Sequence, residues 1–104
     1  MASREVAEGT VGQGVDEIIA YTIDVSNWGN LHASPNITVV VWDDTGTNVT
    51  SIVMPSGTPS AVGNVITLPP LKLLTANTSY RVEVKFTESG NNVLECILPV
   101  AGEE

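Results

Sequence analysis

Cysteine and basic residues are scarce in this chain of 104 residues. The single cysteine, Cys96, cannot form a disulfide within the chain, so we expect packing to hold the fold and synthesis to take place in a reducing cytoplasm. Four Lys and Arg stand against twelve Asp and Glu, which gives a formal net charge of −8. Because such an acidic chain lacks the basic patch that phosphate backbones and anionic lipids require, we expect no nucleic acid and no membrane among its partners.

Long apolar runs and catalytic groupings are missing as well. A membrane-spanning helix needs about 20 consecutive apolar residues, and no stretch of the chain approaches this length. Residues 1–14 have neither the basic start nor the apolar centre of a secretion signal. The sole histidine, His32, stands in a loop rich in Ser, Asn and Gly without a nucleophile motif nearby. Asp43 and Asp44 belong to a DDTG turn, where Asp side chains usually cap their own backbone. We therefore predict a non-enzymatic protein without a metal or cofactor.

The positive signal is a series of short segments in which apolar and polar residues alternate, as in half-buried β-strands. The clearest alternation places Tyr80, Val82, Val84 and Phe86 on one face of a strand. Strands are predicted over residues 16–25, 37–42, 48–54, 64–68, 80–87 and 93–100, separated by turns and loops at 26–36, 43–47, 55–63 and 88–92. This pattern, without helical periodicity, predicts an all-β antiparallel sandwich.

Three parts are expected along the chain. Residues 1–14 carry three glycines and little apolar surface, so we expect a flexible arm or an edge strand there. Residues 15–100 are expected to form the sandwich, and residues 101–104 an acidic tail. Cys96 alternates with Leu94 and Leu98, which predicts a small buried hydrophobic residue in the core.

The segment from Leu74 to Val84 reads L-x-x-x-T-x-Y-x-V-x-V and resembles the tyrosine corner of fibronectin type III and immunoglobulin-like domains. The resemblance implies an immunoglobulin-like or fibronectin type III-like sandwich of about seven strands. It also implies that Leu74 and Tyr80 are structural residues and that Tyr80, at the start of a late strand, hydrogen-bonds back across the sandwich.

Residues 16–100 are also similar to small immunoglobulin-like proteins encoded among the structural genes of tailed bacteriophages. This resemblance implies a virion accessory role, with the major capsid protein or another virion protein as partner. The expected function is that of a capsid decoration or head-associated protein located in the virion. A tail or baseplate accessory protein of the same fold is an alternative that the sequence leaves open.

Candidate contact residues are the apolar residues that the core of a sandwich does not require. The run Val39–Trp42 is apolar throughout, which predicts an extra patch on the outer face of its strand. The predicted partner-binding residues are Val6, Val11, Trp28, Val40, Trp42 and Met54. Self-association is a further expectation, as is carbohydrate binding by stacking of Trp28 or Trp42 on sugar rings.

Overall fold

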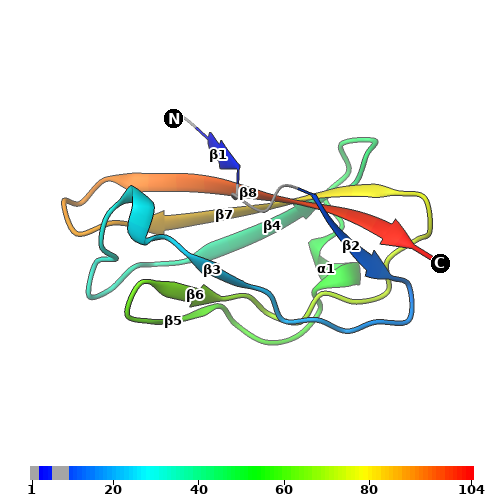
Figure 1. Ribbon diagram of the computed structural model, residues 1–104, viewed down its shortest axis with the longest axis horizontal. Coiled ribbons are helices and arrows are strands. Elements are labelled where there is room, and N and C mark those ends of the chain that lie inside the picture. The colour runs from blue at the N-terminus through cyan, green and yellow to red at the C-terminus, as the bar shows by residue number, and fades with distance from the viewer. Residues whose placement is uncertain (1–2, 6–9) are drawn as a thin grey trace.

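The computed structural model describes residues 3–5 and 10–104 and shows an all-β sandwich of two sheets (Figure 1). The larger sheet contains β1 (Ser3–Glu5), β2 (Val11–Gly14), β4 (Thr38–Trp42), β7 (Ser79–Thr87) and β8 (Val93–Glu103). The smaller sheet contains β3 (Thr22–Asp24), β5 (Ser60–Val62) and β6 (Val65–Thr67). Two short helices, η1 (Ser26–Trp28) and α1 (Thr50–Val53), lie in the connections.

The strand order agrees with the predicted immunoglobulin-like architecture. The larger sheet runs β1-β8-β7-β4, with β2 also pairing with β8, and the smaller runs β3-β6-β5. Immunoglobulin constant-type domains place strands B, E and D in one sheet and C, F and G in the other. Here β3, β6 and β5 correspond to the first set and β4, β7 and β8 to the second. Pairing is antiparallel except that β1 and β2 run parallel to β8.

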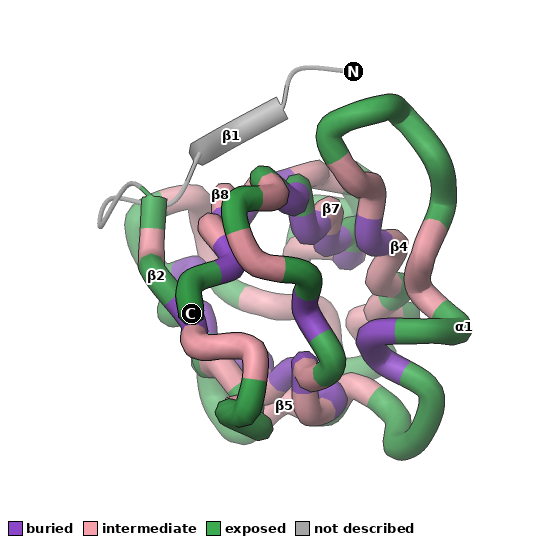
Figure 2. Tube along the Cα trace, turned by 90° about the vertical axis from the view of Figure 1, so that its right-hand side faces the viewer, coloured by how far each residue is buried: buried purple, intermediate pink, exposed green. Residues whose placement is uncertain are grey.

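The core lies between the two sheets, as the end-on view in Figure 2 shows by burial. The alternation predicted for β7 is confirmed, because Tyr80, Val82, Val84 and Phe86 are all buried. Their register partners on β8 include Cys96 and Leu98, and Cys96 is fully buried as predicted. The smaller sheet supplies Ile23 and Ile66 from the opposite side, and Leu68 joins them directly after β6.

Tyr80 has the geometry of a tyrosine corner. Its hydroxyl accepts a hydrogen bond from Thr75 N–H at 2.8 Å, and Leu74 beside it is buried. The same corner contacts the end of β8, where Gly102 N–H donates to Thr78 C=O and Gly102 C=O accepts from Asn77 N–H. The prediction of a tail over residues 101–104 is therefore wrong, because these hydrogen bonds keep the chain in β8 up to Glu103.

The strand predicted over residues 48–54 is also wrong, because α1 occupies most of it. The side chain of Asn48 accepts hydrogen bonds from the backbone and hydroxyl of Thr50, and Thr50 Oγ1 in turn accepts from Val41 N–H at 2.8 Å. Backbone pairing with β4 is limited to an isolated bridge between Trp42 and Asn48 and a hydrogen bond from Val49 N–H to Val41 C=O, and the side-chain hydrogen bonds of Thr50 take over from there. Val53 and Met54 turn into the core instead.

Two other strands differ in extent from the prediction. The segment 16–25 forms a strand only over β3, although Ile19 makes an isolated bridge to Leu71. Of its residues with predicted inward side chains, Ile23 and Val25 are buried, whereas Ile19 and Tyr21 are half-buried. β5 lies inside the predicted loop 55–63. It pairs with β6 through a two-residue Gly-Asn turn in which Gly63 has a φ of 60°, a conformation that suits glycine.

Candidate interaction surface

The outer face of the larger sheet brings together apolar side chains from its two flanking strands. Register places Val40 of β4 and Ile97 of β8 on either side of Glu83, and Trp42 and Pro99 on either side of Arg81. Val40, Trp42, Ile97 and Pro99 are all half-buried, and their side chains point away from the core because their strand neighbours point into it. We call these four residues together with Arg81 and Glu83 the outer patch.

Glu83 fixes the side chains at the centre of the outer patch. One carboxylate oxygen accepts a hydrogen bond from the indole Nε1 of Trp42 at 2.8 Å, and the other lies 3.4 Å from Nε of Arg81. The Trp42 ring is therefore held against β7 by a charge-assisted hydrogen bond. Arg81 is 54% exposed at its side chain and Glu83 25%, so the ion pair itself contributes little stability. Its effect is to orient a large aromatic ring on the surface.

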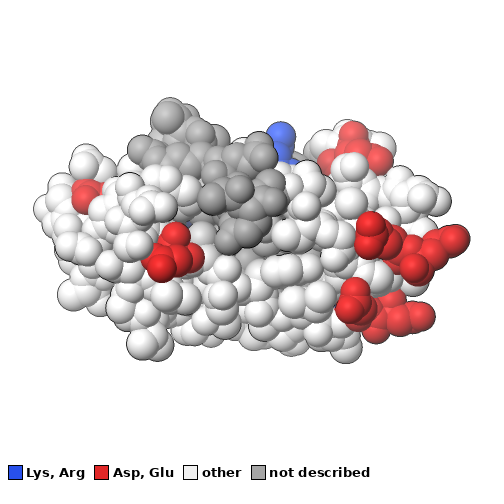
Figure 3. All heavy atoms as spheres, in the orientation of Figure 1, with Lys and Arg blue, Asp and Glu red and all other residues white. Residues whose placement is uncertain are grey.

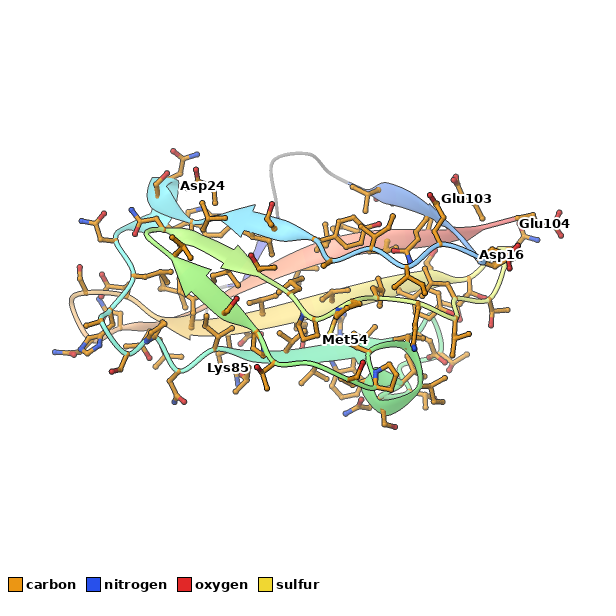
Figure 4. All side chains as sticks on the ribbon, turned by 90° about the horizontal axis from the view of Figure 1, so that it is seen from below. Asp16, Asp24, Met54, Lys85, Glu103 and Glu104 are labelled. Atoms are coloured by element: carbon orange, nitrogen blue, oxygen red, sulfur yellow. The ribbon has the colours of Figure 1, made fainter. Side chains whose placement is uncertain are left out.

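The charges on the outer face of β4, β7 and β8 are balanced. Arg81 and Lys85 are two of the four basic residues in the chain, and they share the face with Glu83 and Glu95. Its formal charge is therefore close to zero in a chain whose net charge is −8. Acidic side chains gather instead at the ends of the sandwich, where Asp16, Glu103 and Glu104 lie together and Asp24 lies at the opposite end (Figures 3 and 4).

The structure places the predicted contact residues in different environments. Val40 and Trp42 lie on the outer patch, and Val11 packs partly against the core. The prediction that Met54 forms part of a surface patch is wrong, because the chain turns inward after α1 and leaves Met54 only 7% exposed (Figure 4). Val6 lies outside the described residues.

Ile97 and Pro99 are the members of the outer patch that sequence reasoning missed. The alternation that assigns Leu94, Cys96 and Leu98 to the core also assigns the residues between them to the outer face. What the alternation cannot supply is the register between β4, β7 and β8, which decides that these two residues share rows with Val40 and Trp42.

Trp28 lies apart from the outer patch, in η1. Its ring stacks on Phe86 with centroids 6.4 Å apart and an angle of 23° between the planes. It also lines a groove of ≈ 580 Å³ between β8 and β3, together with Tyr21, Ile23 and Leu98 and with the polar residues Asp24, Ser26 and Asn27. Backbone and side-chain hydrogen bonds with Ser26 lower the pKa of Asp24 below its ordinary value, so its carboxylate is ionised at neutral pH.

The candidate reactive residues serve local structure. His32 Nδ1 accepts a hydrogen bond from Ser34 N–H at 2.9 Å. Asp43 Oδ1 accepts from the Thr45 hydroxyl and from the N–H groups of Thr45 and Thr47, and these bonds lower its pKa. Within the described ranges, 3–5 and 10–104, no three His, Cys, Asp or Glu side chains converge as a metal-binding group would. None of the helices in this part of the chain is long and apolar enough to cross a membrane.

Comparison with models of known protein families and with curated proteins finds no match to this chain.

Proposed function

We propose that this chain is a non-enzymatic structural protein of a tailed-phage virion that docks on the capsid lattice through the outer patch. The observation that supports this proposal most is the Trp42 ring, which Glu83 holds in place among the half-buried apolar residues of the outer patch. Oriented aromatic residues with adjacent arginine are typical of residues that dominate binding at protein interfaces. The phage assignment itself comes from the sequence resemblance and is part of the proposal.

A small contact of this kind suits binding in many copies. The chain has a total accessible surface of 5685 Å², of which one flat sheet face is a modest share. Standard protein interfaces bury about 800 Å² on each partner. A lattice of identical coat subunits provides repeated sites, and simultaneous contacts to neighbouring subunits raise the overall affinity by avidity.

The proposal is tested by rebinding the purified protein to particles that lack it. Trp42→Ala removes the indole and Ile97→Lys places a charge in the same patch, and both are expected to weaken binding at least about tenfold. Val62→Lys is the matched control, because Val62 is 84% exposed on the smaller sheet, away from the patch. Normal binding by both patch variants would overturn the proposal.

Quantitative mass spectrometry of purified particles distinguishes the possible places in the virion. A copy number that is a simple fraction of the coat protein number is expected for a capsid decoration protein. A few copies per particle would indicate a tail or baseplate protein instead. Complete absence from particles would contradict a virion role.

A second candidate function, carbohydrate binding, follows from the groove at Trp28. The groove combines an aromatic side chain with the carboxylate, hydroxyl and amide groups of Asp24, Ser26 and Asn27, which suit sugar hydroxyls. Titration with a panel of oligosaccharides should then quench tryptophan fluorescence in Trp42→Phe but not in Trp28→Phe. A flat response of the wild-type chain to every glycan would rule this function out.

A further inference from the structure

Two long stretches of the chain are free of charged residues. Residues 25–42 and 45–71 contain no Asp, Glu, Lys or Arg, although the chain as a whole carries twelve acidic residues. These two stretches include β4, α1, β5 and β6. β4 is the outermost strand of the larger sheet and β5 that of the smaller, and α1 lies beside β4, on the side of the sandwich away from β2 (Figure 2). We call the side formed by β4 and β5 the open edge.

The backbone of the open edge has unused hydrogen-bonding groups. Val41 directs its N–H to Thr50 Oγ1 at 2.8 Å and receives Val49 N–H on its C=O at 2.9 Å, so both groups point away from β7. Alternate residues of an antiparallel strand point their backbone groups to the same side, so Val39 and Ile37 also point away from β7. In the described part of the chain, neither of these two residues has a backbone partner on that side.

A groove of ≈ 490 Å³ runs next to these unused groups. Its lining comes from the segment before β4 and from β5, and it mixes apolar with polar surface, with Leu31, His32, Pro35, Ile37, Ser60 and Ala61 among its residues. Natural sheets usually protect an edge strand with charged side chains, especially lysine, because an unpaired edge is a template for pairing with another chain. The stretches that form the open edge have no such charges.

We propose that the open edge is a self-association surface, on which β4 pairs antiparallel with β4 of a second copy. The unused groups belong to residues 37 and 39, so a two-fold axis through Thr38 pairs Ile37 of each copy with Val39 of the other. Four backbone hydrogen bonds then form across the axis, in the pattern of an antiparallel ladder. The larger sheets of the two copies become one continuous sheet with both outer patches on the same face.

The electrostatic repulsion between two copies is smallest at the open edge. Two chains of charge −8 repel each other, and the repulsion is smallest when they meet where neither carries charge. Asp43 and Asp44 follow the Trp42 end of β4, and the axis through Thr38 places the antiparallel partner's acidic turn at the opposite end of the paired strands. The inference concerns an edge and not the outer patch, so it stands or falls independently of the proposed function.

Sedimentation velocity over a range of concentrations tests the proposal with Thr38→Glu. Thr38 is exposed and lies opposite Lys85 within its own copy, so a Glu side chain there is compatible with the fold but meets its counterpart across the axis. The wild type is expected to dimerise and Thr38→Glu to dimerise at least about tenfold more weakly. Thr22→Glu is the control, since it adds the same charge at an exposed position of β3. A wild type that stays monomeric at all concentrations, or equal weakening by both variants, would overturn the proposal.

A Thr38→Cys variant tests the register. Residue 38 would face its counterpart in a pair without backbone hydrogen bonds, where Cα atoms are about 4.5 Å apart and a disulfide can form. Cys96 is buried and does not compete. Mild oxidation is expected to give a disulfide-linked dimer joined through residue 38, identified by peptide mass spectrometry, whereas Thr22→Cys is expected to stay largely unlinked. Equal linkage in both variants would contradict the proposed axis.

Discussion

The two edges of the sandwich are built differently. On the edge beside β2, the side chain of Gln13 is fully buried and joins the two layers. Its Nε2 donates to Leu71 C=O at 2.7 Å and to Glu17 C=O at 3.1 Å, and its Oε1 accepts from the Tyr21 hydroxyl at 2.9 Å. We call this the closed edge. On the open edge, Val41 N–H donates to Thr50 Oγ1 and Val41 C=O accepts from Val49 N–H, and among the described residues Ile37 and Val39 have no backbone partner on that side.

The difference shows how one buried amide can replace a stretch of strand pairing. Gln13 has both donor and acceptor groups, so it satisfies backbone groups of the smaller layer while β2 itself pairs with β8. Thr50 has a single hydroxyl and reaches one backbone group of β4. We therefore expect the closed edge to contribute to folding stability and the open edge to remain available for association.

The largest effect is expected from Gln13→Ala. The substitution removes the side-chain donor of Glu17 C=O, the acceptor of the Tyr21 hydroxyl and one of the two donors to Leu71 C=O. It also opens a cavity, and together these losses should lower the free energy of unfolding by about 3 kcal/mol. Gln13→Met keeps most of the volume and isolates the loss of hydrogen bonds. Urea unfolding measures both variants, with Ser60→Ala at the open edge as a control expected to change stability by less than about 0.5 kcal/mol. A loss below about 1 kcal/mol in Gln13→Ala would remove the contrast between the edges.

A smaller effect is expected from Thr50→Val at the open edge. It removes the acceptor of Val41 N–H and one side-chain bond to Asn48, with an expected loss of about 1.5 kcal/mol in urea unfolding. Thr50→Ser keeps the hydroxyl and should lose less. If Thr50→Val and Thr50→Ser lower the free energy of unfolding equally, the hydroxyl does not stabilise this end of β4.

Tyr21→Phe should cost about 1 kcal/mol, because it removes one donor from Gln13 and leaves the two backbone bonds of that side chain in place. Thermal unfolding measures the change. A Tyr21→Phe and Gln13→Met double variant should lose less than the sum of the two single losses, since both remove the same hydrogen bond. Simple additivity would show that the Tyr21 hydroxyl and Gln13 do not act together.

The smallest effect is a dependence on alkaline pH. Burial, and then the nearby charge of Glu17, raises the pKa of Tyr21 above its ordinary value of 10.0. The folded state therefore holds this proton more tightly than the unfolded state, so stability is intact below pH 10 and falls as the pH rises above it. Comparing unfolding of the wild type and Tyr21→Phe between pH 8 and pH 11 should show a steeper decline in the wild type. Parallel declines would mean that other groups cause the alkaline loss.

The parts of the fold that sequence reasoning predicted are those with regular alternation. The inward positions of β7, the buried Cys96 and the Asp43 turn all follow from local pattern. The role of Gln13 does not follow from local pattern, because it stands between two glycines and its partner Leu71 is 58 residues away in the sequence. α1 does not either, since the apolar residues of 48–54 are compatible with a strand until the side chains of Asn48 and Thr50 bind the backbone.

The candidate surfaces, too, were predictable from the sequence only where they follow from local alternation. The outward positions of Val40 and Trp42 follow from the apolar run in β4, whereas the rows that join them to Ile97 and Pro99 depend on strand register. The open edge could not be predicted from the sequence, because it is defined by the backbone groups of β4 that lack a hydrogen-bond partner. Only the three-dimensional arrangement of Val41, Val49 and Thr50 shows which groups are already hydrogen-bonded.

Residue-resolved amide hydrogen exchange tests the contrast between the two edges most directly. At low protein concentration the amides of Ile37 and Val39 should exchange quickly, while the amides of Ile19 and Leu71, which are paired with each other, stay protected. Raising the concentration should slow exchange at Ile37 and Val39 and leave Ile19 and Leu71 unchanged. Strong protection of Val39 in the dilute monomer, or exchange at Val39 that does not change with concentration, would contradict the account.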